Sequence, residues 1–366
     1  MNNALLIIGE DIKINQPFLN YIFENYMAKF GELGDIKFIE KNDKNMPLAI
    51  QNLAKKYSSI LIFSSDENYH LVAKIIATLT SDILELKFSQ TLAPSMSKLI
   101  KKDSFLIVLD GCEINLVKVN PLQKLPEILI NDTEKSQKFF IFADDLEDLR
   151  EYFEPICAKF DIDLSLSKFS KFLILASAKE RKFGKLVGFI DEVLEVLSNQ
   201  VIMEENLAKF IVEKLKAIGA KISFAESCTA GLIASKIGEI SGASEVFDGS
   251  LVTYSNQIKH IWLDVSEDVL EEFGAVSKEC VIKMIDGAIE ASGANFALAV
   301  SGIAGPTGGS EQKPVGTVFI GAGSRNGKKL VDRFFIQGDR NYIRNESVNI
   351  AFSMLLKLKP DLFFRE

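Results

Sequence analysis

The chain has 366 residues, of which 47% are apolar and 25% charged, and this length predicts two or three globular domains. Its 42 basic and 50 acidic residues give a net charge of −8 with no basic stripe, which argues against nucleic acid as a partner. No apolar run approaches the roughly 18 residues of a spanning helix, and the run at 4–8 lacks the basic stretch of a signal peptide. We therefore expect a cytoplasmic protein that binds no membrane.

Residues 1–135 alternate short apolar runs with helical patterns. This alternation predicts a mostly parallel sheet covered by helices on both faces, which is an α/β domain. The expected strands are 4–9, 59–63 and 105–109, and the expected helices are 18–27 and 69–80.

Residues 136–200 change character and form a small α+β unit of a size that is marginal for a separate core. We expect the segment 198–203 to be a linker to the next domain. The expected strands are 139–142 and 171–176, and the expected helices are 144–159 and 186–197.

Residues 201–366 open with an amphipathic helix over 207–218, which Gly219 ends in the expected cap position. The alternation that follows predicts a further α/β domain. Its expected strands are 221–225, 246–254, 296–300 and 315–322, and its expected helices are 231–239, 278–292 and 343–357.

Cysteine and histidine usage excludes several chemistries. The four cysteines are widely spaced without a CxxC pair, so we expect no structural zinc, no other metal site and no disulfide framework. The two histidines are His70 and His260, and His260 beside Lys259 is typical of an ordinary helix-surface residue. A hydrolase of this composition needs a lysine, a tyrosine or a carboxylate as its base.

The first candidate motif, at 225–231, is Ala-Glu-Ser-Cys-Thr-Ala-Gly. A strand leads directly into hydroxyl residues where a helix begins, so free N–H groups of that helix would stabilise an anion beside Ser227. Ser227 or Thr229 would otherwise serve only as an N-cap. Cys228 is a rival nucleophile, but no histidine is placed to activate it.

The second motif, at 252–259, contains Tyr254 at the end of a strand and Lys259 on the helical turn that follows. A serine needs a base to attack, and a lysine with a lowered pKa replaces histidine in Ser-Lys enzymes. The alternative is a surface lysine beside a buried tyrosine.

The third motif is the glycine-rich segment 301–310, which is neither a Walker A loop nor a GxGxxG fingerprint. Its glycines allow a ligand to approach the backbone, or else form a plain turn. Arg340 and Arg344 follow near a helix start and suit a phosphate or carboxylate. An Asp339–Arg340 ion pair is the alternative.

Taken together, AESCTAG, VTYSNQIK, GAVS, SGIAGPTGG, KPVGTV and GDR resemble the CinA family in order and spacing, over about 160 residues. The resemblance implies a C-terminal α/β/α sandwich that is similar to nicotinamide mononucleotide (NMN) deamidase and needs no cofactor. It implies Ser227 as nucleophile, with Tyr254 and Lys259 as the activating pair, in what is expected to be a homodimer. Ala230 departs from the glycine usual in the family. The implied contacts to the NMN phosphate and ribose are Thr229, Gly302, Ala304, Gly305, Gly308, Gly309 and Arg340.

The resemblance weakens upstream. It implies a degenerate molybdopterin-binding-like domain at 1–135 and a small KH-like domain at 136–200. Residues 63–67 read Phe-Ser-Ser-Asp-Glu where the family carries a glycine loop, which argues against ADP-ribose pyrophosphatase activity. Two alternatives to the amidase stay open: that pyrophosphatase, and a non-catalytic protein tied to competence.

Overall fold

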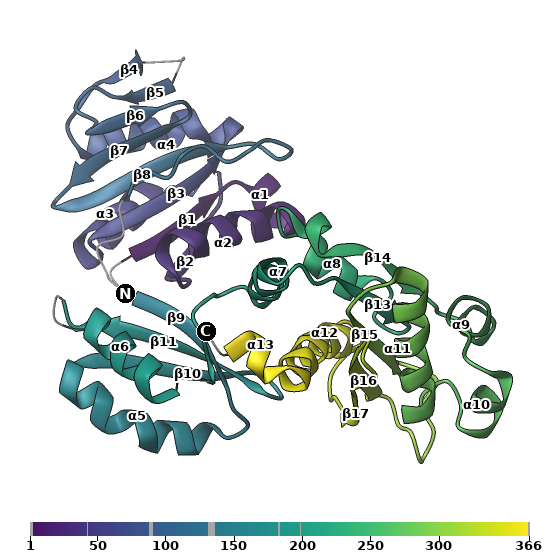
Figure 1. Ribbon diagram of the computed structural model, residues 1–366. Coiled ribbons are helices and arrows are strands. Elements are labelled where there is room, and N and C mark those ends of the chain that lie inside the picture. Colours follow the sequence, from purple (N-terminus) through teal and green to yellow (C-terminus); the bar gives the residue numbers. More distant parts are fainter. Residues whose placement is uncertain are drawn as a thin grey trace. The chain divides into compact units, whose positions relative to one another are not determined.

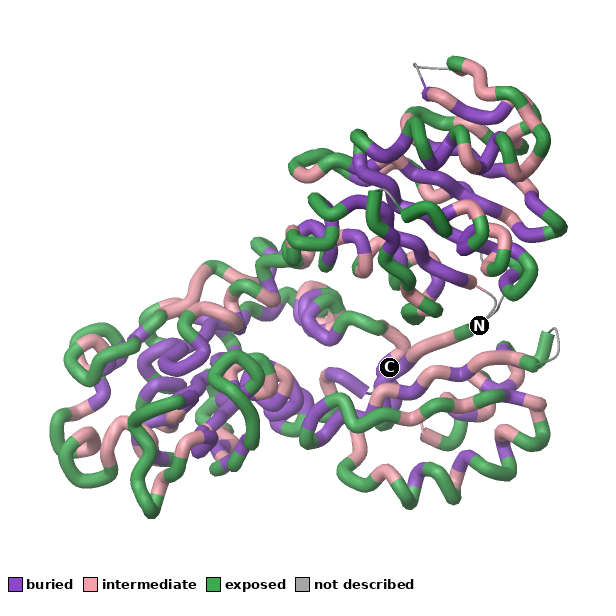
Figure 2. The backbone as a smooth tube through the Cα atoms, turned by 180° about the vertical axis from the view of Figure 1, so that it is seen from behind, coloured by how far each residue is buried: buried purple, intermediate pink, exposed green. Residues whose placement is uncertain are grey.

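Alternating strands and helices organise the chain into several sheets, and the protein has an α/β multi-domain architecture (Figure 1). The computed structural model describes residues 3–41, 43–87, 91–130, 136–181, 184–197 and 199–364. It divides into two units, Met1–Glu134 and Lys135–Glu366. In each unit the central strands are buried and the covering helices expose one side (Figure 2). Within the described ranges, no helix has the length and apolarity needed to cross a membrane.

The first unit is built on a six-stranded sheet in the order β2-β1-β3-β8-β7-β6, with a small β4-β5 hairpin beside it. Two apolar clusters cover its two faces, as expected for a largely parallel sheet. Its strands are β1 (Asn3–Ile8), β2 (Asp35–Ile39), β3 (Ser59–Ser65), β4 (Leu84–Lys87), β5 (Thr91–Pro94), β6 (Leu99–Lys101), β7 (Ser104–Leu109) and β8 (Cys112–Val119). Its helices are α1 (Glu10–Ile14), α2 (Gln16–Phe30), α3 (Met46–Lys56) and α4 (Asp66–Leu79).

The expected strand at 105–109 exists, but it runs antiparallel to its neighbour instead of joining the parallel set. β7 and β8 form a hairpin whose turn residues, Asp110 and Gly111, have φ angles of 51° and 86°. Asp-Gly is the sequence signal for such a two-residue turn. β8 was missed because polar residues interrupt it, and its buried Asn115 is satisfied by Ser104 Oγ and the Leu129 amide.

The segment that replaces the family's glycine loop forms no loop at all. Residues 63–65 complete β3, and α4 begins at the next residue, Asp66. A helix that starts directly after the strand leaves no separate backbone loop for a nucleotide at this point.

The second unit opens with a four-stranded sheet in the order β10-β11-β9-β12. The expected linker at 198–203 was wrong in part, because β12 lies within it, is buried and pairs with β9. The alternating pattern of 162–170 was also overlooked. The elements are β9 (Ser136–Phe142), α5 (Leu146–Phe160), β10 (Ile162–Ser170), β11 (Leu173–Glu180), α6 (Leu186–Leu197) and β12 (Val201–Ile202).

The rest of the second unit is a five-stranded sheet in the order β14-β13-β15-β16-β17, with helices on both faces (Figure 1). Its strands are β13 (Ile222–Glu226), β14 (Phe247–Val252), β15 (Phe296–Gly302), β16 (Thr317–Ser324) and β17 (Lys329–Phe335). Its helices are α7 (Leu207–Ala217), α8 (Leu232–Gly238), η2 (Ala243–Glu245), α9 (Asn256–Leu263), α10 (Glu267–Glu272), α11 (Lys278–Ser292), α12 (Arg340–Leu358) and α13 (Pro360–Phe364).

One face of this sheet packs on α7, α8 and α12, and the other packs on α9 and α11, which makes three layers. The first of these cores also includes Phe140 and Ile202 of the four-stranded sheet and Phe172 of the turn between β10 and β11. The two sheets of the second unit therefore share apolar packing. A division into separate domains at residue 200 stays a prediction.

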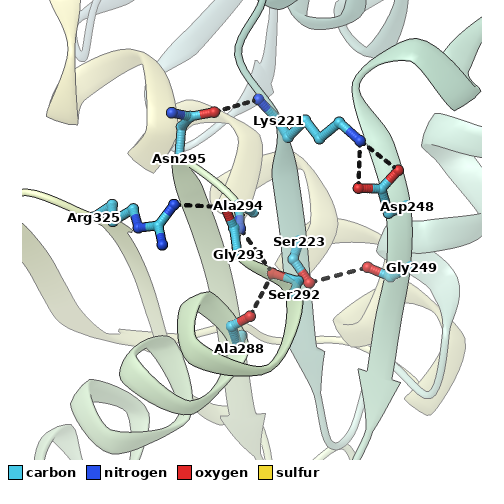
Figure 3. A network of polar contacts seen from close by, with 10 residues as sticks. All are labelled: Lys221, Ser223, Asp248, Gly249, Ala288, Ser292, Gly293, Ala294, Asn295 and Arg325. Carbon is cyan, nitrogen blue, oxygen red and sulfur yellow. Dashed lines mark hydrogen bonds and ion pairs between the residues drawn. The ribbon is translucent and has the colours of Figure 1, made fainter.

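A polar network closes the end of the five-stranded sheet where β13, β14 and β15 begin (Figure 3). Lys221 Nζ lies 2.8 and 2.6 Å from the two carboxylate oxygens of Asp248, and its backbone N–H donates to Asn295 Oδ1. Arg325 donates to the carbonyl of Gly293. These exposed contacts hold the strand starts together, so the opposite end of the same strands is left to carry the candidate site.

Candidate active site

Ser227 follows the last residue of the buried strand β13, at the carboxyl edge of the sheet. Its backbone N–H donates to Val300 O on β15, which fixes the start of the turn. The side chain is 9% exposed. A crevice at the carboxyl ends of parallel strands is the usual place for a ligand in an α/β sheet, so Ser227 lies where the motif predicted it.

The expectation of free N–H groups at the start of α8 was wrong. The carboxylate of the preceding residue, Glu226, accepts hydrogen bonds from the backbone N–H groups of Ile233 and Ala234, at 3.1 and 3.0 Å. Ser250 also donates to this fully buried carboxylate. Glu226 therefore neutralises the positive end of α8 from within, and a substrate oxyanion needs other donors.

Lys259 lies against Ser227. Its Nζ is 3.1 Å from Ser227 Oγ, 2.8 Å from the carbonyl oxygen of Thr253 and 3.4 Å from that of Tyr254. A neutral lysine amine has two N–H groups and one lone pair. With the two N–H groups directed at the carbonyls, the lone pair faces the Ser227 hydroxyl, which is the arrangement a base requires.

The surroundings of Lys259 favour the neutral amine. The side chain is only 1% exposed, and no ion pair with an acidic group is present among the described residues. Burial lowers the pKa of Lys259 below its ordinary value, and the nearby thiols of Cys280 and Cys228 oppose this only in part. The surface-lysine alternative is therefore excluded by the fold.

Cys228 does not compete as a nucleophile. Burial raises the pKa of its thiol to about 11, so the reactive thiolate is scarce near neutral pH. Burial likewise raises the pKa of Cys280 to about 11. Both thiols act as small apolar walls around the lysine amine.

The position of Lys259 depends on how α9 is held. Ser255 caps the helix by accepting from Ile258 N, and the far end of α9 packs on α11 at Gly287. A Cβ at Gly287 would lie 2.3 Å from the carbonyl oxygen of Leu263, so only glycine permits this approach. His260, expected to be an ordinary helix-surface residue, is half-buried and contacts Val265 O through Nδ1.

Tyr254 belongs to a second group of residues. Its side chain is 56% exposed, and its hydroxyl accepts a hydrogen bond of 2.7 Å from Arg340. Arg340 also donates to the carbonyl of Gly305, again at 2.7 Å. Lys259 meets the backbone carbonyl of Tyr254, whereas the tyrosine hydroxyl is engaged by the guanidinium. This geometry favours direct proton transfer between Ser227 and Lys259 over a relay through the phenol.

The Asp339–Arg340 ion pair considered from the sequence does not form in the described part of the chain. Asp339 instead caps α12 by accepting from Tyr342 N. Arg340 is the first residue of that helix and points to Gly305 and Tyr254.

Arg344, one turn further along α12, holds the turn that carries Ser227. Its guanidinium donates to the carbonyls of Cys228 and Thr229, at 3.1 and 2.8 Å. The two groups of a trans peptide point in opposite directions. The Thr229 N–H therefore points away from Arg344, and it has no acceptor among the described residues.

The glycine-rich segment extends from the end of β15. Gly302 ends the strand, Ala304 is buried, and the exposed Gly308 has a φ angle of 92°. The backbone N–H groups of residues 307–309 have no protein acceptor within the described ranges. The structure thus brings Gly305 to Arg340 and leaves exposed amides at Gly308 and Gly309.

Two polar residues were missed when site residues were chosen from the sequence, Glu226 and Thr253, and Arg344 was considered as a ligand contact although it bonds the carbonyls of Cys228 and Thr229. Glu226 ends β13 six residues before α8 begins, so it lies outside the usual cap position and no cap signal in the sequence indicates it. Nothing in the sequence indicates that the Thr253 carbonyl meets Lys259 or that Arg344 holds the turn after β13, because both contacts depend on how the segments fold together.

Comparison with known proteins gives the family. Residues 204–359 match the family described as the CinA C-terminal domain. A putative competence-damage inducible protein of Caldicellulosiruptor saccharolyticus is 34% identical over 356 residues, which cover 95% of this chain and 78% of that protein. The chain belongs to the CinA family. This membership confirms the resemblance found from the motifs.

Other related proteins match about half of this chain or less. The nicotinamide-nucleotide amidohydrolase PncC of Enterobacter agglomerans is 45% identical over 157 residues, 42% of this chain and 96% of that protein. The crystal structure of the competence/damage inducible protein CihA from Agrobacterium tumefaciens is 44% identical with a TM-score of 0.41, covering 42% of this chain and 93% of that one. Against three CinA-like relatives, the match spans less than half of their length, 47%, 37% and 44%.

Proposed function

We propose that this CinA-family protein hydrolyses the carboxamide of nicotinamide mononucleotide to nicotinate mononucleotide and ammonia. The observation that carries the proposal is the contact of 3.1 Å between the buried Lys259 amine and the Ser227 hydroxyl. The choice of substrate is supported by the relative named nicotinamide-nucleotide amidohydrolase PncC. The match covers 96% of that relative's length.

In the first step, neutral Lys259 takes the hydroxyl proton of Ser227, and Ser227 Oγ bonds to the carboxamide carbon. The carbonyl oxygen gains negative charge, and we assign the N–H of Thr229 as its donor, because Arg344 holds that peptide through Cys228 O and the N–H has no acceptor among the described residues. The C–N bond then breaks, and the leaving nitrogen takes the proton from Lys259 as ammonia departs.

In the second step, water attacks the acyl carbon of the ester on Ser227. Lys259 accepts a proton from this water and returns it to Ser227 Oγ as the ester bond breaks. The products are the nicotinate carboxylate and the restored serine. The two carbonyls that hold Lys259 keep its lone pair directed at the reacting oxygen in both steps.

The rest of the proposed site recognises the nucleotide. Arg340 offers a guanidinium beside the exposed ring of Tyr254, and the amides of residues 307–309 are exposed. A phosphate accepts charge-assisted bonds from such groups. We therefore assign the NMN phosphate to Arg340 and the glycine-rich segment.

The decisive experiment measures ammonia release from NMN by the purified chain, with Ser227→Ala as control. We expect release by the wild type and none above background from the variant. The variant should bind NMN, since the exchange removes one side-chain oxygen and leaves the backbone turn intact. Absence of release by folded wild-type protein would favour a non-catalytic role, as the competence-related name of the C. saccharolyticus relative suggests for that protein.

A further inference from the structure

The second unit contains three threonines whose buried hydroxyls have no hydrogen-bond partner within the described ranges: Thr229, Thr253 and Thr317. Each is fully buried, and all three lie at the edge of the sheet where Ser227 lies. Thr253 follows β14 directly, and β16, which is antiparallel to β15, begins at Thr317. Burying an unpaired hydroxyl destabilises a fold, so a cluster of them beside a nucleophile indicates groups kept for a bound molecule.

Thr253 differs from the other two because its backbone is part of the base. Its carbonyl accepts from Lys259 Nζ at 2.8 Å, and its N–H donates to Glu226 O at 2.8 Å. The residue is therefore held rigidly, between the strand that leads to Ser227 and the lysine that contacts Ser227. Its backbone N–H and carbonyl are both hydrogen-bonded, whereas its hydroxyl has no hydrogen-bond partner within the described ranges.

Covalent geometry limits how far that hydroxyl lies from the lysine. Oγ1 and the carbonyl oxygen of one threonine are separated by roughly 3–4 Å, and that carbonyl oxygen touches Lys259 Nζ. These two distances put Thr253 Oγ1 within roughly 7 Å of Lys259 Nζ, and at a separation of up to about 5.5 Å one water molecule bonds to both atoms at once. A buried water makes about 3 hydrogen bonds, and these two leave a lone pair for attack.

We infer that the Thr253 hydroxyl positions the water that hydrolyses the acyl-enzyme. The inference rests on the proposed function in so far as it takes Ser227 to form an ester. In this step the water oxygen bonds to the acyl carbon, its proton passes to Lys259, and the carbon–Ser227 Oγ bond breaks as Ser227 regains a proton. Thr253 exchanges no atoms, and it orients the water by one hydrogen bond.

The inference separates the two chemical steps. Formation of the ester needs Ser227 and Lys259 but no water, so Thr253→Val should leave it intact. Hydrolysis of the ester should slow about tenfold, because the water loses one of the two groups that orient it. Thr253→Ser restores the hydroxyl and should restore the rate.

The experiment follows p-nitrophenyl acetate, a generic acylating ester, together with NMN. For wild type we expect a burst of p-nitrophenol followed by steady turnover. Thr253→Val should keep the burst, lose about tenfold in the steady rate and accumulate an acetyl adduct visible in the intact mass. With NMN, kcat and KM should fall together in this variant, so that kcat/KM stays near the wild-type value.

Thr91→Val is the matched control. Thr91 is also a buried threonine, but its hydroxyl is paired, donating to Lys101 O and accepting from Asp103 N. We expect Thr91→Val to lower the Tm and keep both kinetic phases, whereas Thr253→Val does not lower the Tm and slows the steady phase about tenfold. A purely structural role for Thr253 would give the opposite pattern.

Three results would overturn the inference: equal loss of burst and steady rate, no acyl adduct in Thr253→Val, or no recovery in Thr253→Ser. If wild type turns over the ester but not NMN, the substrate proposal fails. The role of Thr253 is then tested by the burst and steady rates with p-nitrophenyl acetate alone. If wild type acts on neither compound, Ser227 is not a nucleophile and both proposals fall.

Discussion

Arg340 offers the sharpest test of how the proposed substrate is recognised. Its guanidinium makes two hydrogen bonds of 2.7 Å, to the carbonyl of Gly305 and to the hydroxyl of Tyr254. If Arg340 also binds the NMN phosphate, Arg340→Ala removes a charge-assisted bond, which contributes about 1.5–3 kcal/mol. At about 1.4 kcal/mol for each factor of ten, kcat/KM for NMN should fall between about tenfold and 150-fold on this account alone.

The assay compares NMN with nicotinamide riboside, which lacks the phosphate, on wild type and Arg340→Ala. Arg340→Ala also frees Tyr254 and Gly305, and this effect lowers kcat/KM alike for NMN and for the riboside. The contribution of the phosphate contact is therefore the loss of kcat/KM for NMN beyond the loss for the riboside. Tyr254→Phe is the matched control, because it breaks the bond to Arg340 and keeps the guanidinium. We expect this control to reduce kcat/KM for NMN and for the riboside equally, by less than about tenfold, because the hydrogen bond between Tyr254 and Arg340 is exposed.

Equal losses for NMN and the riboside in Arg340→Ala would refute the phosphate contact. Arg340 would then act only by holding Gly305 and Tyr254 in place. Turnover of the riboside as fast as NMN by wild type would remove the phosphate from recognition altogether.

Four further predictions concern the nucleophile, the base, the turn and the domain. Ser227→Ala should lower turnover by several orders of magnitude while calorimetry still detects NMN binding; a dead Cys228→Ser beside an active Ser227→Ala would point to the thiol. Activity should rise with pH, because burial lowers the pKa of Lys259 and the neutral amine is the reactive form; a flat pH–rate profile, or an active Lys259→Arg, would exclude the lysine. Ala230→Gly should stabilise the protein by about 1 kcal/mol, because Ala230 has a φ of 51° that costs an L side chain about that much, and an unchanged or lower Tm in thermal unfolding would contradict this. A fragment of residues 201–366 should fold and deamidate NMN, and a folded but inactive fragment would show that upstream residues complete the site.

Local patterns were enough to locate the candidate nucleophile and base. Ser227 lies between a continuous apolar run, which predicts a buried strand, and a helical pattern of apolar residues. A sequence displays both patterns directly. The same reasoning placed Lys259 on the turn after a strand. It could not decide whether Lys259 is buried, because on a short helix the burial of one residue depends on what packs over it.

Patterns of this kind fail where polar residues enter the core. β8 runs through the middle of its sheet, yet Asn115 and its charged neighbours disguised it, because their pairing partners come from other segments. β12 was taken for linker because a strand of two residues has no periodicity to detect.

Sequence by itself determined the chemical groups of this protein: a serine, a lysine and a tyrosine in an α/β domain without a histidine that could serve them. Tertiary structure decided what each group does, because function depends on contacts between residues far apart in the chain. Packing of α9 on α11 buries Lys259 against Ser227, Glu226 bonds the N–H groups at the start of α8, and Arg340 bonds the Tyr254 hydroxyl. Such contacts follow from how elements meet in space, and no local pattern encodes them.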